Sequence, residues 1–355
     1  GGGIIGVSTA YYLAKEGMKN IVLLEKGTIC GGSTGRCGAG IRAQWGTEMN
    51  CRLGIAALDI FEQLDEELGM SVGLNQGGYL LVAYNEEEFE TLRKGMVLQN
   101  SLGINSRMIS LKEAREICPG LSADDAFGFF FHGRDGHADP FLTTFAYLEA
   151  AKKMGVSCFR HTACTGITVE NNVVRGVETE RGTISAPIVI NCAGAYAQFI
   201  AKMAGIDLPN WGERHEIMIT EPVAPGVCPC MLMSFSGNYY IQQRPHGSII
   251  CGMSPEGHPQ DFELKTTWYF LEEMSRVLVR LLPRTRGIRV ARQWSGMYDM
   301  TPDAQPIIGE TDVRNFYHST GYSGHGFMLA PVAGKILAQH LAGKTPDIDF
   351  SMLDY

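Results

Sequence analysis

Three glycines and one glutamate near the start of the chain have the spacing of a dinucleotide-binding site. Gly1, Gly3 and Gly6 form a GxGxxG pattern, and Glu25 stands nineteen positions later, at the end of an apolar run. In such sites the glycines permit a tight turn, close approach of the pyrophosphate and close helix–strand packing, and the acidic side chain binds a ribose hydroxyl. A helix over residues 7–15 would direct its free N–H groups toward the phosphates. These residues therefore predict dinucleotide binding.

The GxGxxG pattern normally follows a β-strand, and this sequence begins at the pattern itself. The preceding strand would be central in its sheet, so we expect a chain that begins at Gly1 not to fold stably alone. Cofactor binding and normal melting by such a chain would contradict this expectation.

The segment that follows Glu25 favours FAD over a nicotinamide cofactor. Residues 31–46 form a glycine-rich stretch that contains Arg36 and Arg42. Such a loop can wrap the pyrophosphate of a larger cofactor, whereas a nicotinamide dehydrogenase usually continues with another plain strand–helix unit. A nicotinamide-dependent dehydrogenase stays an alternative, and a colourless protein that is active with NAD would establish it.

Composition excludes several classes of partner. The 355 residues include 30 Lys and Arg against 38 Asp and Glu, a net charge of −8, which argues against nucleic acid or an anionic membrane surface as partner. No apolar run approaches the roughly 20 residues of a transmembrane helix. We expect a cytoplasmic protein, or one held at a membrane only through a partner.

Ten scattered cysteines in a chain of this length indicate reduced thiols and not a disulfide framework. Cys228 and Cys230 form a CxC pair, but no His or Cys cluster lies close to them in the sequence. We therefore expect two ordinary thiols in a loop and no metal site.

The order of predicted elements indicates two interleaved domains. Short apolar strands alternate with helices in three separated segments, which is typical of an α/β domain, and a run of strands from 215 to 252 is typical of an antiparallel sheet. We expect a cofactor-binding domain from 1–68, 136–205 and 291–355, and a β-rich substrate domain from 69–135 and 206–290. The main expected helices are 50–69, 86–100, 111–118, 141–154, 263–281 and 330–341.

Five motifs are spread along the chain, at residues 32–42, 135–140, 214–216, 294–298 with 301–303, and 321–328. In this order they resemble the D-amino-acid oxidase superfamily of flavoproteins, and within it the β subunits of dye-linked L-proline dehydrogenase and heteromeric sarcosine oxidase. The resemblance covers essentially the whole chain and implies a glutathione-reductase-type, Rossmann-like FAD-binding domain with an inserted antiparallel β-rich substrate domain. It also implies oxidation of an amino acid at its C–N bond.

The resemblance assigns FAD contacts to individual positions. The ADP half would be held by Gly1, Gly3, Gly6 and Glu25, and the adenine would meet the backbone of Cys164. The pyrophosphate and flavin would be lined by Lys26, Ser33, Arg36, Gly40 and Ile41. The residues beside the ribityl chain and the flavin ring would be Ala193, Gly194, Gly324, Gly326, Phe327 and Met328.

Two departures from the family pattern affect substrate binding. Tyr298 stands where related glycine oxidases have a carboxylate-binding Arg, and Met328 stands where monomeric sarcosine oxidase has a Lys that shares this task. Another residue must then hold the substrate carboxylate, or the substrate differs. Arg42 and Arg244 are the candidates for this anchor.

Hydrogen-bond partners for the substrate are expected beside that anchor. Tyr240 and His246 are candidates, and His325 between two glycines is poorly suited to packing alone. The expected substrate pocket therefore contains Arg42, Tyr240 and His325.

Further departures concern oxygen and flavin attachment. No Lys occurs between Lys202 and Lys265, where the monomeric oxidase has a Lys that promotes reaction with O₂. Gly296 and Ala138 replace the cysteine and histidine that carry covalent flavin in relatives. A dehydrogenase with noncovalently bound FAD follows from these differences.

The expected function is oxidation of proline, sarcosine, glycine or a related N-substituted amino acid, by hydride transfer to flavin N5. The resemblance further implies a heteromeric α subunit or another electron acceptor, with FMN at the partner interface. Two alternatives stay open: a FAD-binding electron-transfer or assembly subunit without its own substrate site, and a glycine-oxidase-like oxidase.

Overall fold

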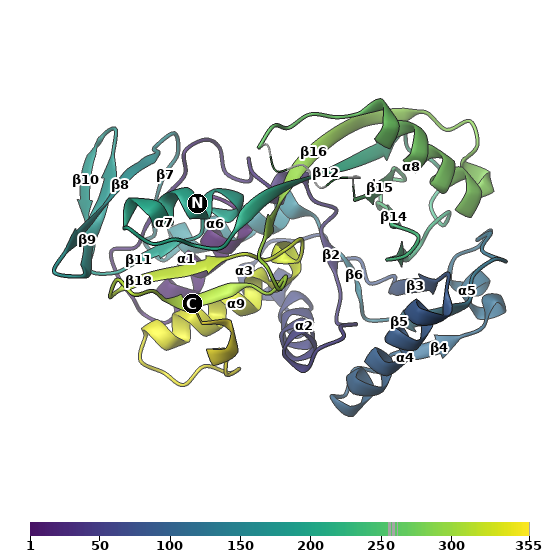
Figure 1. The fold of residues 1–355 in the computed structure, drawn as a ribbon, viewed down its shortest axis with the longest axis horizontal. Coiled ribbons are helices and arrows are strands. Elements are labelled where there is room, and N and C mark those ends of the chain that lie inside the picture. The colour runs from purple at the N-terminus through teal and green to yellow at the C-terminus, as the bar shows by residue number, and fades with distance from the viewer. Residues whose placement is uncertain (255–256, 258–259, 261, 355) are drawn as a thin grey trace.

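The computed structural model describes residues 1–254, 257, 260 and 262–354. Figure 1 shows two halves: one contains both chain termini and most of the helices, and the other is dominated by a large sheet. Each half is assembled from separated parts of the chain. Each half also has its own apolar core.

The helical half is built around two helices that pack closely. The helix after the glycine pattern buries Ile4 and Val7 against the C-terminal helix. A Cβ atom on Gly334 would lie 2.9 Å from the Thr9 backbone nitrogen, so a glycine is needed where the two backbones approach. The helices of this half are α1 (Ile4–Lys15), α2 (Glu48–Phe61), α3 (Leu64–Leu68), α6 (Pro140–Lys153), α7 (Ala197–Met203) and α9 (Gly326–Leu341).

Short parallel pairs form the strand layer of this half. The first strand pairs in parallel with a strand that follows α6, and a second parallel pair lies beside the C-terminal helix. An antiparallel three-stranded sheet projects at the far left of Figure 1. The strands are β1 (Val22–Leu24), β7 (Ser157–Phe159), β8 (Cys164–Glu170), β9 (Val173–Thr179), β10 (Gly182–Ser185), β11 (Val189–Asn191), β17 (Ile307–Glu310) and β18 (Phe316–Thr320).

The other half contains an eight-stranded sheet in the order β16-β12-β15-β14-β13-β3-β5-β4. Every neighbouring pair is antiparallel except β13 with β3, which is parallel. That parallel pair joins the two separate chain segments of this half. The strands are β3 (Tyr79–Ala83), β4 (Arg107–Ile109), β5 (Gly128–His132), β12 (Trp211–Thr220), β13 (Met231–Ser234), β14 (Tyr239–Gln243), β15 (Ile249–Met253) and β16 (Val290–Met300).

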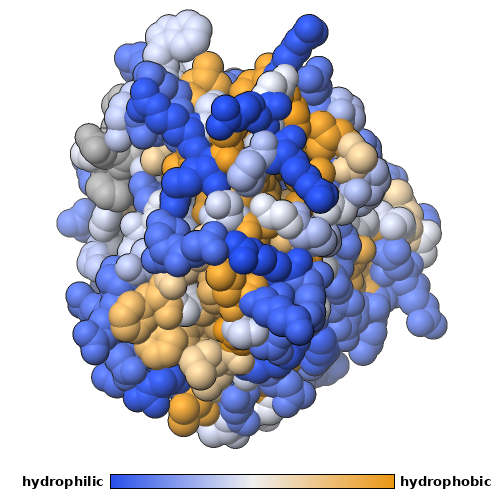
Figure 2. All heavy atoms as spheres, turned by 90° about the vertical axis from the view of Figure 1, so that its right-hand side faces the viewer, coloured by the Kyte–Doolittle hydropathy of each residue, from blue (hydrophilic) through white to orange (hydrophobic). Residues whose placement is uncertain are grey.

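Three helices accompany this sheet: α4 (Glu86–Ser101), α5 (Leu111–Ile117) and α8 (Trp268–Leu281). Figure 2 shows this end of the molecule face-on, where hydrophilic residues dominate and apolar areas interrupt them. Exposed apolar side chains in this half include Met108, Phe127 and Trp268. Within the part of the chain that is described, no helix is both long and apolar enough to cross a bilayer.

The elements differ from expectation in several places. The helix expected over 50–69 is divided into α2 and α3, and α9 begins at Gly326, which places Pro331 inside the helix and not near its start. β13 was not expected because its four residues lack an alternating pattern. β16 pairs along β12, so the large sheet includes the start of the segment that we expected in the cofactor domain.

A two-stranded pair connects the halves. β2 (Gly40–Ile41) lies antiparallel to β6 (Gly136–His137), and both lie between the halves in Figure 1. The long strands β12 and β16 also extend from one half toward the other. The residues that follow β2 therefore lie where the two halves meet.

Candidate active site

A cavity of about 1400 Å³ is lined by residues of both halves. It exceeds the roughly 300–1,000 Å³ of pockets for single small ligands, so it has room for a dinucleotide and a small substrate. Ile41 does not line it, because its side chain is buried in the core of the helical half. The other predicted FAD-contact residues and the three residues of the expected substrate pocket line it: Gly1, Gly3, Gly6, Glu25, Lys26, Ser33, Arg36, Gly40, Arg42, Cys164, Ala193, Gly194, Tyr240, Gly324, His325, Gly326, Phe327 and Met328.

At one end of the cavity the glycine pattern leaves no room for side chains. A Cβ atom on Gly6 would collide with the Gly1 carbonyl oxygen, and one on Gly1 would lie 2.5 Å from the Cys192 carbonyl oxygen. α1 begins here, and its N-cap, Gly3, supplies no side-chain hydrogen bond to the first turn. Thr34 Oγ1 accepts a hydrogen bond from the Ile4 backbone nitrogen at 3.1 Å, and the helix N-terminus here has the geometry that can receive a pyrophosphate.

Glu25 lies at the same end of the cavity. Its carboxylate accepts hydrogen bonds from the backbone nitrogens of Gly2 and Gly27, each at 2.7 Å. A carboxylate has about four acceptor positions, so further hydrogen bonds from ribose hydroxyls are compatible with these two.

The glycine-rich loop is held in shape by its own side chains. The Arg36 guanidinium donates to the carbonyl oxygens of Gly31 and Gly32, and the Arg36 carbonyl accepts from Trp294 Nε1 at 3.0 Å. Arg36 thus stabilises the loop that lines the cavity, in addition to the cofactor contact that the resemblance implies.

A buried carboxylate fixes the second glycine-rich turn. Asp299 accepts hydrogen bonds from Asn210 Nδ2 at 2.7 Å, Thr320 Oγ1 at 2.8 Å and the Gly321 backbone nitrogen at 2.6 Å. Burial raises the pKa of Asp299. The turn continues into Gly324, which has a φ of 89°. A Cβ atom on Gly324 would lie 2.5 Å from the Tyr298 ring, so a side chain does not fit here. The start of α9 is thereby placed at the cavity wall.

Arg42 lies at the end of the cavity expected to bind substrate, and no described residue forms an ion pair with it. It is 4% exposed, its guanidinium carbon lies 4.1 Å from the centre of the Trp45 ring and 5.4 Å from that of Phe235, and its Nε has no hydrogen-bond partner. Burial lowers the pKa of the guanidinium. An unpaired buried cation is costly, so this site is arranged for an anion.

Neutral polar groups surround Arg42. His325 packs edge-on against Trp45 with ring centres 4.4 Å apart, and enclosure in the protein, reinforced by Arg42, lowers its pKa to about 3. Burial raises the pKa of Tyr298 to about 12 and holds the pKa of Tyr240 well above its ordinary value. These groups are therefore uncharged at neutral pH, and they can hydrogen-bond without competing for the anion.

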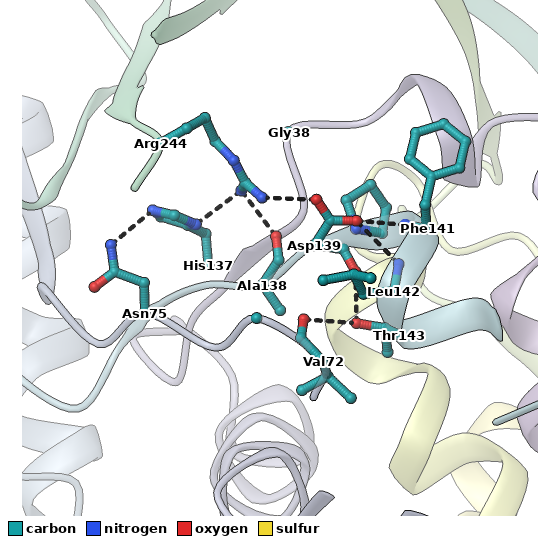
Figure 3. Close-up of polar contacts among 12 residues, drawn as sticks. Gly38, Val72, Asn75, His137, Ala138, Asp139, Phe141, Leu142, Thr143 and Arg244 are labelled. Carbon is teal, nitrogen blue, oxygen red and sulfur yellow. Dashed lines mark hydrogen bonds and ion pairs between the residues drawn. The ribbon is translucent and has the colours of Figure 1, made fainter. Parts of the chain in front are cut away.

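Arg244 is buried but fully engaged, as Figure 3 shows. Its Nη1 donates to His137 Nδ1 at 2.9 Å and to the Ala138 carbonyl at 2.8 Å, and its Nη2 pairs with Asp139 at 3.2 Å. Asp139 in turn caps α6. Neither Arg244 nor His246 is among the cavity-lining residues, so these two candidates for substrate contact lie outside it.

Sequence reasoning missed several residues of the site. Trp45, Tyr79 and Phe235 surround Arg42, and Asp299 fixes the turn before α9. His215 also lines the cavity and stacks on Tyr298 with ring centres 3.6 Å apart. Aromatic residues in strands are too common for their type alone to have indicated this role.

Comparison with known proteins agrees with this geometry. Residues 1–340 match the family described as FAD dependent oxidoreductase, DAO. The chain belongs to this family. It is a flavin-dependent oxidoreductase, its cofactor is FAD, and its fold combines a Rossmann-like FAD-binding domain with a β-rich domain.

Several relatives are similar over nearly the whole chain. The β subunit of sarcosine oxidase from Rhodobacter capsulatus is 28% identical over 347 residues, which are 96% of this chain and 83% of that protein. The crystal structure of L-proline dehydrogenase from P. horikoshii has a TM-score of 0.94 and 35% identity, and the match covers 100% of this chain and 95% of that one. Glycine oxidase from Geobacillus kaustophilus, at 22% identity, shares the fold with a TM-score of 0.91, over 100% of this chain and 96% of that chain.

The residues of the cavity fit FAD in three respects. The side-chain-free glycine turn and the start of α1 can receive the pyrophosphate, Glu25 can receive a ribose, and the start of α9 can face the flavin ring. The cavity continues from these residues to Arg42, which leaves a substrate position beyond the flavin.

Proposed function

We propose that the protein is a dehydrogenase that oxidises the C–N bond of a small amino acid, such as proline, sarcosine or glycine, with Arg42 as the residue that binds the substrate carboxylate. The observation that carries this proposal is the buried Arg42 guanidinium, which has no acidic partner among the described residues. A substrate carboxylate would supply the missing charge. An electron-transfer or assembly subunit without a substrate site would have no use for such a group.

FAD held by the glycine turn, Glu25 and the start of α9 would supply the acceptor for a hydride from the substrate α-carbon. The residues of this chain position the substrate and exclude water. Arg42 orients the carboxylate, and Trp45 and Phe235 form an apolar wall around the ion pair. The neutral hydroxyls of Tyr240 and Tyr298 lie in the same cavity and can hydrogen-bond the substrate. No side chain is required to remove a proton, provided that the amine arrives unprotonated.

The positions of the lysines in the cavity favour a dehydrogenase over an oxidase. Of the described residues that line the cavity, the lysines are Lys19 and Lys26, and Lys26 lies 3.4 Å from the centre of the Tyr196 ring. Both belong to the dinucleotide end, so no lysine lines the substrate end where a relative uses one to promote reaction with O₂. We expect turnover with an artificial dye to exceed turnover with O₂.

FAD is expected to be bound noncovalently. Ala138 and Gly296 offer no nucleophile at the positions used for attachment in relatives. Cys37 lines the cavity, but burial raises the pKa of its thiol to about 12, so it is protonated and unreactive at neutral pH. We also propose a heteromeric partner subunit and FMN at its interface, supported by the relatives named as β subunits of sarcosine oxidase.

Anaerobic mixing of the FAD-loaded protein with L-proline, sarcosine, glycine and D-amino acids tests this function. Bleaching of the flavin absorption by at least one secondary or primary amino acid is expected. Bleaching by none of them would instead support the subunit without a substrate site. Acid precipitation of the same samples should release all the flavin, and flavin that stayed with the pellet would contradict noncovalent binding.

A further inference from the structure

Three cysteine side chains converge in the β-rich half, away from the FAD cavity. Cys118 directly follows α5, whereas Cys228 and Cys230 flank Pro229 just before β13. Their sulfur atoms all lie within 4.8 Å of one another. Each residue is at most 1% exposed. The cluster therefore joins the two separate chain segments from which this half is built.

The backbone around the cluster is held in place by polar contacts. Gln243 Oε1 accepts hydrogen bonds from the backbone nitrogens of Val227 at 2.9 Å and Cys228 at 3.3 Å. The Cys228 thiol lies 3.3 Å from the Cys230 carbonyl oxygen. The turn that presents two of the sulfurs is thus held in place by Gln243.

The spacing of the sulfurs is close to that of a metal thiolate site. A metal–sulfur bond of about 2.3 Å places two sulfur ligands about 3.8–4.0 Å apart in tetrahedral or trigonal geometry. A separation of at most 4.8 Å therefore needs only a small contraction. Within the described chain this is the single group of three or more His, Cys, Asp or Glu side chains with ligand atoms this close.

The simpler interpretation is that these cysteines are small apolar core residues, as single buried cysteines often are. Cys51 and Cys251 are examples of that kind in this chain, since each is fully buried and belongs to no such group. The cluster differs because three sulfurs from two chain segments lie within 4.8 Å of one another. Packing in an apolar core does not require all three side chains to be cysteines.

We propose that Cys118, Cys228 and Cys230 bind one soft, thiophilic metal ion of the Zn²⁺ or Cu⁺ type, which links the two segments of the β-rich half. Thiolate ligands select ions of this class. Each ligating thiol gives its proton to solvent, and no atom changes oxidation state. Because the site is buried, the ion enters during folding and is released only on unfolding.

The first test is the metal content of the FAD-loaded protein after purification under reducing conditions without a nickel resin or chelator. We expect one equivalent of zinc or copper per chain. Cys228→Ser should lower this content at least tenfold, and Cys251→Ser, which changes another fully buried cysteine, should leave it unchanged. Copper would indicate three-coordinate binding by the thiolates alone, and zinc would indicate an additional oxygen ligand.

The second test does not depend on the variant folding. Unfolded wild-type chain is refolded with FAD in the presence of a chelator, Zn²⁺ or Cu⁺, and the melting temperature is measured. A higher melting temperature with one of the metals is expected. Wild-type protein that is metal-free after purification, and that neither binds nor is stabilised by either ion, would overturn the proposal. So would a disulfide between two of the three cysteines in protein alkylated at harvest.

Discussion

Arg42 and Arg244 are both buried arginines, and both border a histidine whose pKa is lowered to about 3, yet their surroundings differ. Arg244 donates to His137 and Ala138 and pairs with Asp139, whereas Arg42 is surrounded by aromatic rings and its Nε has no partner. The engaged arginine connects α6 to β14, and the unpaired one lines the cavity. Burial alone therefore does not distinguish a candidate anchor from a structural arginine, and we propose Arg42 as the anchor because its surroundings, unlike those of Arg244, supply no acidic partner among the described residues.

The largest effect is expected from Arg42→Met. Loss of the carboxylate partner in a desolvated site should reduce kcat/KM by roughly 30- to 1,000-fold, or about 2–4 kcal/mol. The free energy of unfolding should stay the same or increase, because an unpaired buried charge is removed. Steady-state kinetics with a dye acceptor and denaturant unfolding measure the two effects.

The matched control is Arg52→Met, since Arg52 is exposed and pairs only with Glu48 on the surface of α2. Its kinetics should equal those of the wild type. If Arg42→Met binds FAD and keeps the wild-type kcat/KM, then Arg42 does not bind the substrate carboxylate.

Arg244→Met should show the opposite pattern. The charged hydrogen bonds that Figure 3 displays would be lost, leaving the Ala138 carbonyl without its donor, so the protein should be destabilised by about 1.5–3 kcal/mol. KM for the amino acid should change little, because Arg244 does not line the cavity. If Arg244→Met raised KM as much as Arg42→Met does, the two arginines would not differ in substrate binding as we propose.

Asp139→Asn should have a smaller effect on the same network. Asn retains the N-cap of α6 but loses the charge that pairs with Arg244 across 3.2 Å. Because the Asp139 side chain is 32% exposed, we expect a loss of about 0.5–1 kcal/mol, whereas Asp139→Ala should lose about 1 kcal/mol more with the cap. Wild-type stability of Asp139→Asn would show that the ion pair contributes nothing, and equal destabilisation by both substitutions would show that the cap contributes nothing.

Acid stability extends the comparison, because the histidines of both regions contribute to it. His137 and His325 have a pKa of about 3 in the folded protein, against an ordinary value of about 6.5 when unfolded. Between these values the unfolded chain binds more protons, so stability falls as the pH decreases, by up to about 1.4 kcal/mol per pH unit for each histidine.

His137→Gln and His325→Gln should each make this pH dependence shallower when unfolding is measured from pH 7 to pH 4. A non-oxidisable carboxylate such as acetate, bound beside Arg42, should shift the dependence in wild type and in His137→Gln. It should shift it less in His325→Gln. If the carboxylate shifted the pH dependence equally in all three proteins, His325 would not be coupled to an anion bound beside Arg42.

The dinucleotide end was predictable from sequence because its function depends on backbone geometry in a short stretch. Gly1, Gly3, Gly6 and Glu25 act through turns, close approach and helix position, which residue type and spacing determine. Ile41 was the exception, since its place in the motif could not show that its side chain turns into the core.

The substrate end was predictable only in part because it is assembled from distant segments. Tyr79, Phe235 and His325 meet Arg42 and Trp45 only once the sheet and α9 are in place. Sequence could not separate Arg42 from Arg244, because the difference lies in their partners. Likewise, Cys118 precedes Cys228 by 110 positions, so nothing in the sequence indicated that the two sulfurs meet.

The parallel pairing of β3 with β13 has a consequence for synthesis on the ribosome. β3 emerges with Tyr79, but its partner begins at Met231, roughly 150 residues later. At about 5–20 residues per second, that edge of β3 waits for roughly 8–30 s with its hydrogen-bonding groups unpaired. During this interval the nascent chain needs protection from pairing with a neighbour, so this enzyme should depend on chaperones more than a protein whose strands pair in order.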